Sequence, residues 1–328
     1  MIAADLGVST ATVSLALRDS PLVAEATRAR IKARADEMGY IYDRRAASLR
    51  TQRSDIVGVI VRDIINPFFA EILQSLEEEL GTNRQTFLLC NHQDDLAQQA
   101  AFIDTLKQFG ADGVIMSPSV GTDAQDIADI EAAGLPVVLV ARTVEGTDVP
   151  AFQGDDERGF ELVTRHLIDQ GHRDIALVGG TRLTSTGRAR RKGFARAFQK
   201  ADLPLPERHD IETPYSRLVG TQVAERLVES DARPTAIACC SDTLALGVMA
   251  GLRHHGLEPG RDIAVTGYDD IEEASISAPR LTTVDDGHHE MGRLAARALY
   301  AKIHKQETEG GPHLMQPTLK LRDSVQGV

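Results

Sequence analysis

The chain has 328 residues, more than one ordinary hydrophobic core accommodates, so we expect two or three domains. Its 42% hydrophobic and 26% charged residues are typical of a globular protein, and no stretch reaches the roughly 20 apolar residues that cross a bilayer. Because the first residues also lack the basic and then apolar layout of a secretion signal, we expect a cytoplasmic protein.

The net charge of −12 would by itself argue against nucleic acid, but the charges are unevenly distributed. Residues 1–53 contain nine Lys or Arg and six Asp or Glu and carry +3, which leaves −15 for the remainder. A basic end on an acidic body is typical of a tethered DNA-binding module. The acidic body would repel phosphates, so we expect any DNA contact to lie within the first segment.

Two helices are predicted within this first segment. The Ser9 hydroxyl, after a turn at Gly7 and Val8, is suited to cap a helix from about Thr10 to Arg18. A second helix runs from about Ala24 to Met38, and the glycine that follows stops it. The pattern is that of a short helical domain.

From residue 55 onward, short apolar runs alternate with amphipathic helices. The runs are continuously apolar, which is typical of strands buried on both faces of a parallel sheet. They are DIVGVIV, QTFLLCN, DGVIMS, PVVLVA, DIALVGG, TAIACC and DIAVTGY. These strand–helix units are too many for one sheet. The sequence therefore predicts an α/β fold of two similar lobes. We expect a ligand cleft between the lobes, at the carboxyl ends of the strands.

Several segments, in order and at consistent spacing, resemble the LacI/GalR family of transcription regulators over nearly the whole chain. They are GVSTATVSLAL, TRARIKARADEMGYIYDRRAASLR, INPFFAEI, GHRDIALVGG, SDTLALGVMAGLRHHG, DIAVTGYDD, PRLTTVDD and PTLKLRDS. The resemblance implies an N-terminal helix-turn-helix headpiece and a two-lobed sensor domain of the periplasmic-binding-protein type (type I) with parallel sheets. It also implies a sequence-specific DNA-binding regulator, usually a repressor, controlled by a small molecule in the cleft.

The resemblance also divides the chain. We expect the headpiece at residues 1–40, a hinge helix and linker at 41–53, and the ligand-sensing domain at 54–328. The first lobe of the sensor is expected at about 54–154 and 284–310, and the second at about 155–283 and 311–328. In the family, the first headpiece helix begins several residues before the position of Met1, so we expect the native chain to start upstream.

By resemblance, the helix that begins at Thr10 is the recognition helix, which lies in the major groove and presents its first residues to base edges. Leu15 stands where family members often carry a long polar side chain, so we expect a thymine-methyl contact there in place of a hydrogen bond. Thr12 and Ser14 are expected to bind phosphate. The expected DNA contacts of this helix are Ser9, Thr10, Ala11, Thr12, Ser14 and Leu15.

Residues 42–50, YDRRAASLR, resemble the hinge helix that orders when two subunits occupy an operator. Small residues such as Ala46 let paired helices approach closely, and Leu49 matches the leucine wedged into the minor groove. Arg44 is a further expected DNA contact. Because two-fold protein symmetry calls for a two-fold site, we expect a homodimer on a pseudo-palindromic double-stranded operator.

In the sensor, the resemblance indicates effector contacts. Arg190, in GRARRKGF, matches the family's main ligand arginine, whose donors suit vicinal hydroxyls or a carboxylate, and Asp269, in GYDD, matches the ligand carboxylate. Pro67 is suited to a first helical turn, and of Phe68 and Phe69 we expect one in the core and one against a sugar. The candidate ligand residues are Asp63, Phe68, Phe69, Arg142, Arg190, Tyr215, Ser241 and Asp269, and the expected effector is a sugar or sugar derivative.

Two alternatives to a transcription regulator are an enzyme and a small-molecule binding protein that does not bind DNA. The chain has no Walker loop, G-x-S-x-G or H-E-x-x-H motif, so we expect neither catalysis nor a cofactor. Adjacent histidines such as His288 and His289 point apart on a helix, and the three cysteines are expected to be buried thiols, so no metal site is expected. A small-molecule binding protein without DNA binding would share the sensor fold. The chain ends without the C-terminal helix of tetrameric members, so we expect a dimer.

Overall fold

Three helices surround a small apolar core at the start of the chain. In this computed structural model, which describes residues 1–17, 19–40, 53–206 and 209–328, Met1–Ser54 form one structural unit and Asp55–Val328 the other. The helices of the first unit are α1 (Ile2–Leu6), α2 (Thr10–Leu17) and α3 (Glu25–Glu37). They bury Ile2, Ala16, Val23, Ile31 and Ala35.

Local chemistry sets the ends of α1 and α2. Gly7 ends α1 with a φ of 66°, in the left-handed region that favours glycine. Ser9 caps α2 as predicted, because its Oγ accepts a hydrogen bond from the backbone amide of Thr12 at 3.0 Å. Arg34 of α3 pairs with Asp5 of α1 at 2.6 Å, but such exposed pairs contribute at most about 1 kcal/mol, so the apolar core holds the helices together.

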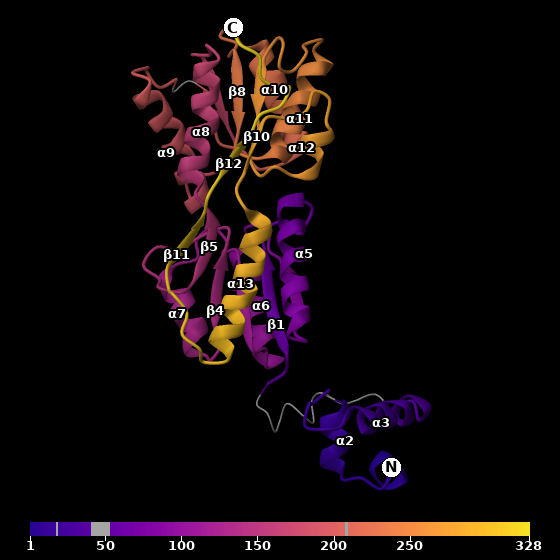
Figure 1. Cartoon of the computed structure of the whole chain (residues 1–328). Helices are drawn as coiled ribbons and strands as arrows, with labels where there is room; N and C mark the ends of the chain where they lie inside the picture. Colours follow the sequence, from indigo (N-terminus) through magenta and orange to yellow (C-terminus); the bar gives the residue numbers. More distant parts are fainter. Residues whose placement is uncertain (18, 41–52, 207–208) are drawn as a thin grey trace. The chain divides into compact units, whose positions relative to one another are not determined.

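A six-stranded parallel sheet forms the first lobe of the second unit, with strand order β11-β5-β4-β3-β1-β2. Its strands are β1 (Ile56–Val61), β2 (Thr86–Asn91), β3 (Gly113–Met116), β4 (Val137–Val140), β5 (Ala151–Gly154) and β11 (Pro312–Met315). Helices α5 (Pro67–Thr82) and α13 (His288–Ile303) pack side by side on one face (Figure 1). Helices α6 (Leu96–Gln108) and α7 (Ala124–Ala132) cover the other face.

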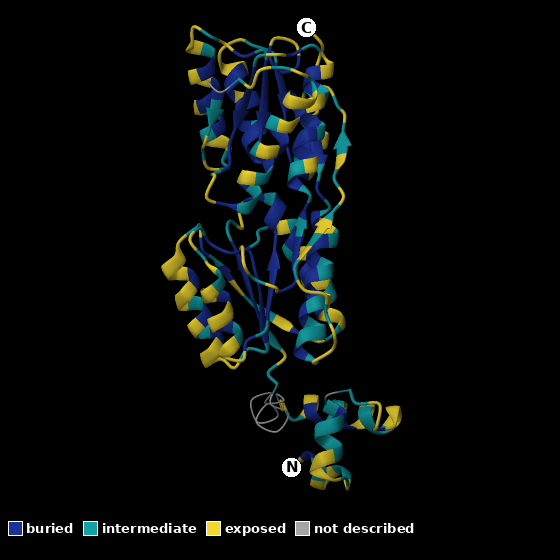
Figure 2. Cartoon of the chain, turned by 90° about the vertical axis from the view of Figure 1, so that its left-hand side faces the viewer, coloured by how far each residue is buried: buried dark blue, intermediate teal, exposed yellow. Residues whose placement is uncertain are grey.

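A four-stranded parallel sheet, in the order β7-β6-β8-β9, forms the second lobe. Its strands are β6 (Ile175–Val178), β7 (Asp210–Ile211), β8 (Ala236–Cys239) and β9 (Ala264–Thr266). Helices α8 (Asp156–Asp169) and α9 (Ser185–Lys200) cover one face, and α10 (Arg217–Glu229) and α11 (Asp242–His254) cover the other, with the short α12 (Glu272–Ile276) beside them. Figure 2 shows the inner strands of both lobes buried between partly exposed helices, as the continuous apolar runs predict. For the run QTFLLCN the prediction of burial on both faces was wrong, because it forms the edge strand β2, in which only Cys90 is buried.

The chain crosses between the lobes three times: after β5, after β10 (Thr283–Asp285) and after β11, which leads into β12 (Thr318–Lys320). β10 and β12 pair in antiparallel fashion. β11 pairs with β5, so residues 312–315 belong to the first lobe, whereas the sequence placed the whole of 311–328 in the second. That boundary was wrong because β11, PHLM, is a partly exposed edge strand whose sequence contains no continuous apolar run.

Helices α10 and α11 pack backbone against backbone. A Cβ atom added at Gly247 would lie 2.0 Å from the carbonyl oxygen of Arg217, and one added at Gly220 would lie 2.3 Å from that of Leu244. Only glycine permits this approach, so these two positions fix the spacing of the helices.

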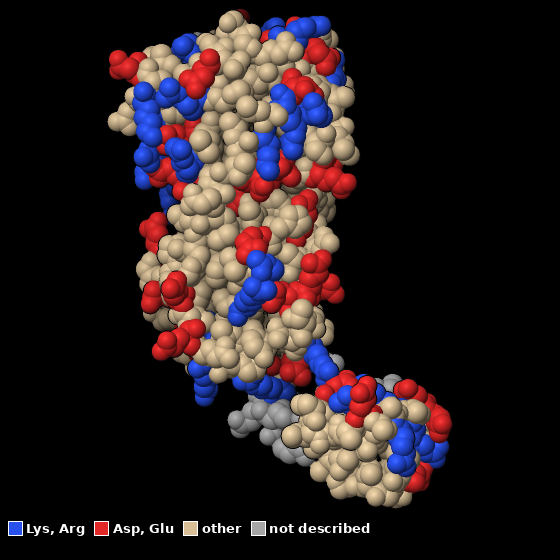
Figure 3. All heavy atoms as spheres, in the orientation of Figure 1, with Lys and Arg blue, Asp and Glu red and all other residues tan. Residues whose placement is uncertain are grey.

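Charged residues of α8 and α9 pair with each other. Lys192 lies 2.7 Å from Glu157, and Arg196 lies 2.9 Å from Glu157 and 3.2 Å from Glu161. Figure 3 shows blue and red side chains interspersed over the surface of the sensor. The basic run of α9 is thus matched by nearby carboxylates, which leaves it poorly suited to bind phosphates.

Candidate functional site

The exposed start of α2 is the first candidate site. Ser9, Thr10 and Ala11 are exposed, and the Ser9 and Thr12 hydroxyls hydrogen-bond each other at 2.8 Å. Thr12 and Ser14 are half-buried. A capped helix start with small polar side chains can approach base edges and phosphates closely.

Leu15 has a packing role that the sequence did not predict. Its side chain is half-buried and packs against the core of the first unit, beside Ala16 and Ile31. Part of its surface is therefore committed to the fold, and only the remainder can contact DNA. Three further DNA contacts expected from the sequence, Arg44, Ala46 and Leu49, lie outside the described residues.

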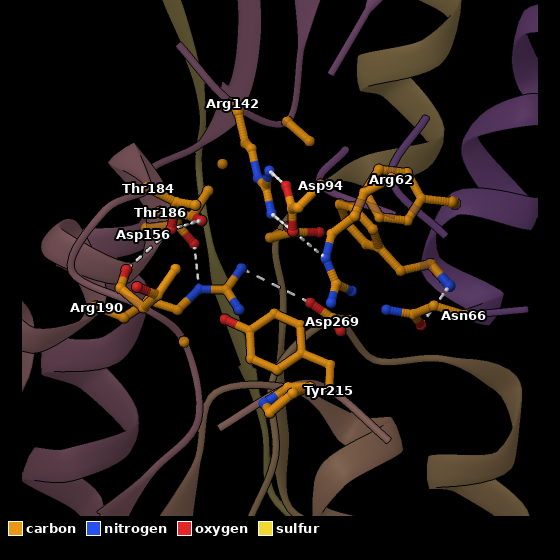
Figure 4. A pocket seen from close by; sticks show the side chains of 18 of the residues that line it. Arg62, Asn66, Asp94, Arg142, Asp156, Thr184, Thr186, Arg190, Tyr215 and Asp269 are labelled. Atoms are coloured by element: carbon orange, nitrogen blue, oxygen red, sulfur yellow. Dashed lines mark hydrogen bonds and ion pairs between the residues drawn. The ribbon is translucent and has the colours of Figure 1, made fainter. Parts of the chain in front are cut away.

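The second candidate site is a cavity of about 330 Å³ between the two lobes of the sensor (Figure 4). The residues that line it follow the carboxyl ends of strands: Arg62 follows β1, Arg142 follows β4, and Asp269 follows β9. Open parallel sheets bind ligands at this edge. Other lining residues that bear on recognition are Asn66, Phe68, Phe69, Asp94, Asp156, Thr181, Thr184, Thr186, Arg190, Glu212, Tyr215 and Asp286.

On the first-lobe side, Asp94 holds two guanidinium groups. Arg62 Nε donates to Asp94 Oδ2 at 2.8 Å, and Arg142 donates to the same carboxylate and, at 3.0 Å, to the carbonyl of Pro118. Burial alone would raise the pKa of Asp94, but the two arginines lower it to about 2. Asp94 is therefore ionised at neutral pH and fixes both arginines at the cavity wall.

On the second-lobe side, Arg190 is buried among polar partners. Its Nε donates to Asp156 Oδ1 at 2.7 Å, another nitrogen donates to the Cys240 carbonyl, and the guanidinium carbon lies 4.1 Å from the Tyr268 ring centroid. Asp269 lies 3.8 Å from Arg190. Burial raises the pKa of Asp269 well above its usual range and that of Asp156 to about 6, although Arg190 opposes both shifts.

The cavity thus combines buried donors, buried acceptors and aromatic faces. Phe68 and Phe69 are both buried and both line it, and Tyr215 closes the second-lobe side. Guanidinium and carboxylate groups together suit a ligand that both donates and accepts hydrogen bonds, and flat rings suit its apolar face.

Comparison with known proteins finds a family match for each of the two units of the chain. The profile of the bacterial regulatory proteins of the lacI family matches residues 2–43, and the profile described as periplasmic binding proteins and sugar binding domain of LacI family matches residues 54–322. The chain belongs to the LacI family. It is therefore a DNA-binding transcription regulator rather than an enzyme, and the match to residues 2–43 argues against a binding protein that lacks a DNA-binding module.

Relatives of the LacI-family chain share its full length. The HTH-type transcriptional repressor PurR of Vibrio parahaemolyticus is 31% identical over 97% of this chain and 96% of its own. The lac repressor dimer bound to operator and the anti-inducer ONPF is 25% identical, with a TM-score of 0.86 over 99% of this chain and 98% of that one. The CelR–cellobiose complex is 27% identical, with a TM-score of 0.76 over 99% and 98%.

The structure brings together most of the effector residues expected from the LacI resemblance. Phe68, Phe69, Arg142, Arg190, Tyr215 and Asp269 line the cavity. Asp63 and Ser241 are not among its lining residues. Asp63 accepts a hydrogen bond from the backbone of Ile65 at 3.1 Å, and Ser241 is fully buried and caps α11 by accepting from Leu244 at 3.2 Å. Both side chains hydrogen-bond within local turns, and neither lines the cavity.

Sequence reasoning missed several cavity residues, among them Arg62, Asn66, Asp94 and Asp156. A usable signal exists for Arg62, because a charged residue directly after a buried strand lies at the ligand edge of the sheet. Asn66 caps α5 and also accepts from the Thr243 hydroxyl at 3.2 Å.

In the described part of the LacI-family chain, no helix is both long and apolar enough to span a bilayer.

Proposed function

We propose that the chain is a cytoplasmic repressor that binds a pseudo-palindromic operator as a homodimer, and that a sugar or sugar derivative in the cavity controls its affinity for DNA. The observation that carries the proposal is the presence of Arg190, Asp269 and the rings of Phe68 and Tyr215 in one cavity. Guanidinium donors and a carboxylate acceptor suit vicinal hydroxyls, and the rings suit the apolar face of a sugar. The cellobiose of the CelR complex and the operator of the lac repressor complex support it.

We assign DNA reading to the headpiece at residues 1–40, the hinge to 41–53 and effector sensing to 54–328. Thr10 and Ala11 are exposed at the capped start of α2, which supports their assignment as base-reading residues. Thr12 and Ser14 approach phosphates, and Leu49 enters the minor groove at the operator centre.

Contacts between the lobes support coupling of the cavity to lobe movement. On one side, the backbone amide of Thr143 donates to Ser185 Oγ at 3.0 Å, and on the other, the Thr243 hydroxyl donates to Asn66 Oδ1 at 3.2 Å. A ligand that strengthens or breaks these contacts shifts the equilibrium between closed and open lobes. A coupling of about 1–3 kcal/mol changes operator affinity from about five-fold to over a hundredfold.

The first test is binding of the full-length protein to DNA from upstream of its own gene, followed by fluorescence anisotropy with and without a panel of sugars. We expect salt-dependent, site-specific binding that one class of sugar alters. Arg190→Ala should retain operator binding and lose the response to sugar, because it removes the main buried donor of the cavity.

Arg165→Ala is the matched control, since Arg165 is an exposed arginine of α8 that pairs with Asp169 of the same helix at 2.8 Å. It should respond to sugar like the wild-type protein. A normal sugar response of the Arg190→Ala variant would refute the assignment of the cavity. Sugar binding without operator binding by the wild-type protein would refute the proposed DNA function.

A further inference from the structure

Two histidines and a glutamate converge at the beginning of α13. His288 Nε2 lies 2.7 Å from Glu71 Oε2, and His289 Nε2 lies 3.2 Å from the same oxygen. The two imidazole rings stack with their centroids 5.0 Å apart. The expectation that these neighbours point apart was wrong, because they open the helix, where no preceding turn restricts their rotamers.

A fourth residue orients the buried ring. Asp286 Oδ1 lies 3.0 Å from His288 Nδ1, and both side chains are 3% exposed. A carboxylate on one imidazole nitrogen leaves the other nitrogen directed at the metal in many protein sites. Here the second nitrogen, Nε2, points to Glu71. The Phe68 ring, 5.4 Å from that of His288, bounds this group on the side of the effector cavity.

The charges around the group favour a cation. The carboxylates of Glu71 and Asp286 lie 2.7 Å and 3.0 Å from the two ring nitrogens of His288. The positive end of α13 opposes a cation at this position, and Glu71, Asp285 and Asp286 offset it. Lys320, 3.2 Å from Asp285, neutralises part of that negative charge.

We propose that Glu71, His288 and His289 bind a divalent transition-metal ion such as Zn²⁺, with Asp286 positioning His288. Two imidazoles and one carboxylate form a known zinc ligand set. Their ligand atoms lie within 4.8 Å of one another, and a tetrahedral Zn²⁺ requires about 3.4 Å between ligands, which small side-chain rotations reach. Water completes the coordination.

The site lies at a junction of the sensor. Glu71 belongs to α5 of the first lobe and also accepts a hydrogen bond from the backbone of Glu272 in the second lobe. His288 begins the helix into which the second crossing leads, and Asp286 lines the effector cavity. An ion at Glu71 therefore borders the effector cavity without occupying it.

Zinc titration of the EDTA-treated, dialysed full chain by competition with a chromophoric chelator tests the proposal. We expect His289→Ala to weaken Zn²⁺ binding at least ten-fold, and its fold should be retained because His289 is 64% exposed. His255→Ala is the matched control, since His254 and His255 form another adjacent, exposed pair, at the end of α11. It should bind Zn²⁺ like the wild-type protein.

Cobalt gives an independent measurement. The visible absorption of the Co²⁺-loaded wild-type protein should shift in Glu71→Gln, which removes the carboxylate ligand and conserves the side-chain volume. Equal Zn²⁺ affinities of wild type and His289→Ala would overturn the proposal, and so would an equal loss in His255→Ala. A Co²⁺ spectrum that Glu71→Gln leaves unchanged would exclude Glu71 as a ligand and overturn the site as assigned.

Discussion

Asp94→Asn is expected to destabilise the sensor. The carboxylate is one quarter exposed and holds both Arg62 and Arg142, and its pKa of about 2 lies below the ordinary value of 3.8. At 1.36 kcal/mol per pKa unit, the ionised form contributes about 2 kcal/mol relative to a neutral side chain, and solvent screening reduces the expected loss to about 1–2 kcal/mol. The asparagine keeps the shape and removes the charge.

The assay is urea unfolding followed by circular dichroism at pH 7. Because the folded pKa of Asp94 lies below the unfolded one, its contribution is complete above about pH 5 and is lost as the pH falls through 3.8 toward 2. The difference between wild type and Asp94→Asn should therefore narrow as the pH is lowered. Asp104→Asn is the control, since Asp104 is 69% exposed and pairs with Lys107 of the same helix. Equal losses in the two variants would refute the reasoning.

Three further predictions concern packing and DNA binding. Gly247→Ala should destabilise the sensor by about 1–3 kcal/mol in urea unfolding, because the added Cβ would lie 2.0 Å from the Arg217 carbonyl oxygen. Gly81→Ala is the control: the position in α5 has open space for a Cβ, so the substitution should stabilise the sensor by about 0.5–1 kcal/mol. Ser9→Ala should cost the headpiece about 1 kcal/mol, measured by hydrogen exchange of α2 amides; unchanged exchange would contradict the cap. Leu49→Ala should reduce operator affinity in anisotropy measurements and leave sugar binding intact; unchanged operator affinity would exclude the wedge.

Local and periodic signals predicted most of the fold. The Ser9 cap depends on residues three apart, and the buried strands depend on runs of four to six apolar residues, so both can be read from a short window. β11 and β5 were not predicted because their sequences, PHLM and AFQG, lack such a run. The order of strands and helices then allowed the two-lobed sensor to be inferred.

The cavity was harder to predict because its polar network joins distant positions. Asp94 pairs with Arg142, which is 48 residues away in the sequence, and with Arg62, which is 32 residues away, and neither pairing has a sequence signature. Ser241 shows the converse case, since a polar residue after a strand can cap the following helix and lie outside the cavity lining. The convergence of His289 on Glu71 also depends on contacts between α13 and α5, far apart in sequence.

Buried charges of the second lobe line the cavity that we propose as the effector site. Asp156 lies 2.7 Å from Arg190, but Asp269 lies 3.8 Å away, too far for a direct hydrogen bond. Burial raises the pKa of both carboxyls, since one guanidinium only partly replaces the lost water. Ligand hydroxyls that donate to Asp269 and accept from Arg190 would complete this network, and closure of the lobes would strengthen those bonds by excluding water. If the proposed effector binds here, the groups that cost stability without ligand would favour the closed, ligand-bound form, and this difference would give the effector the means to shift the lobes.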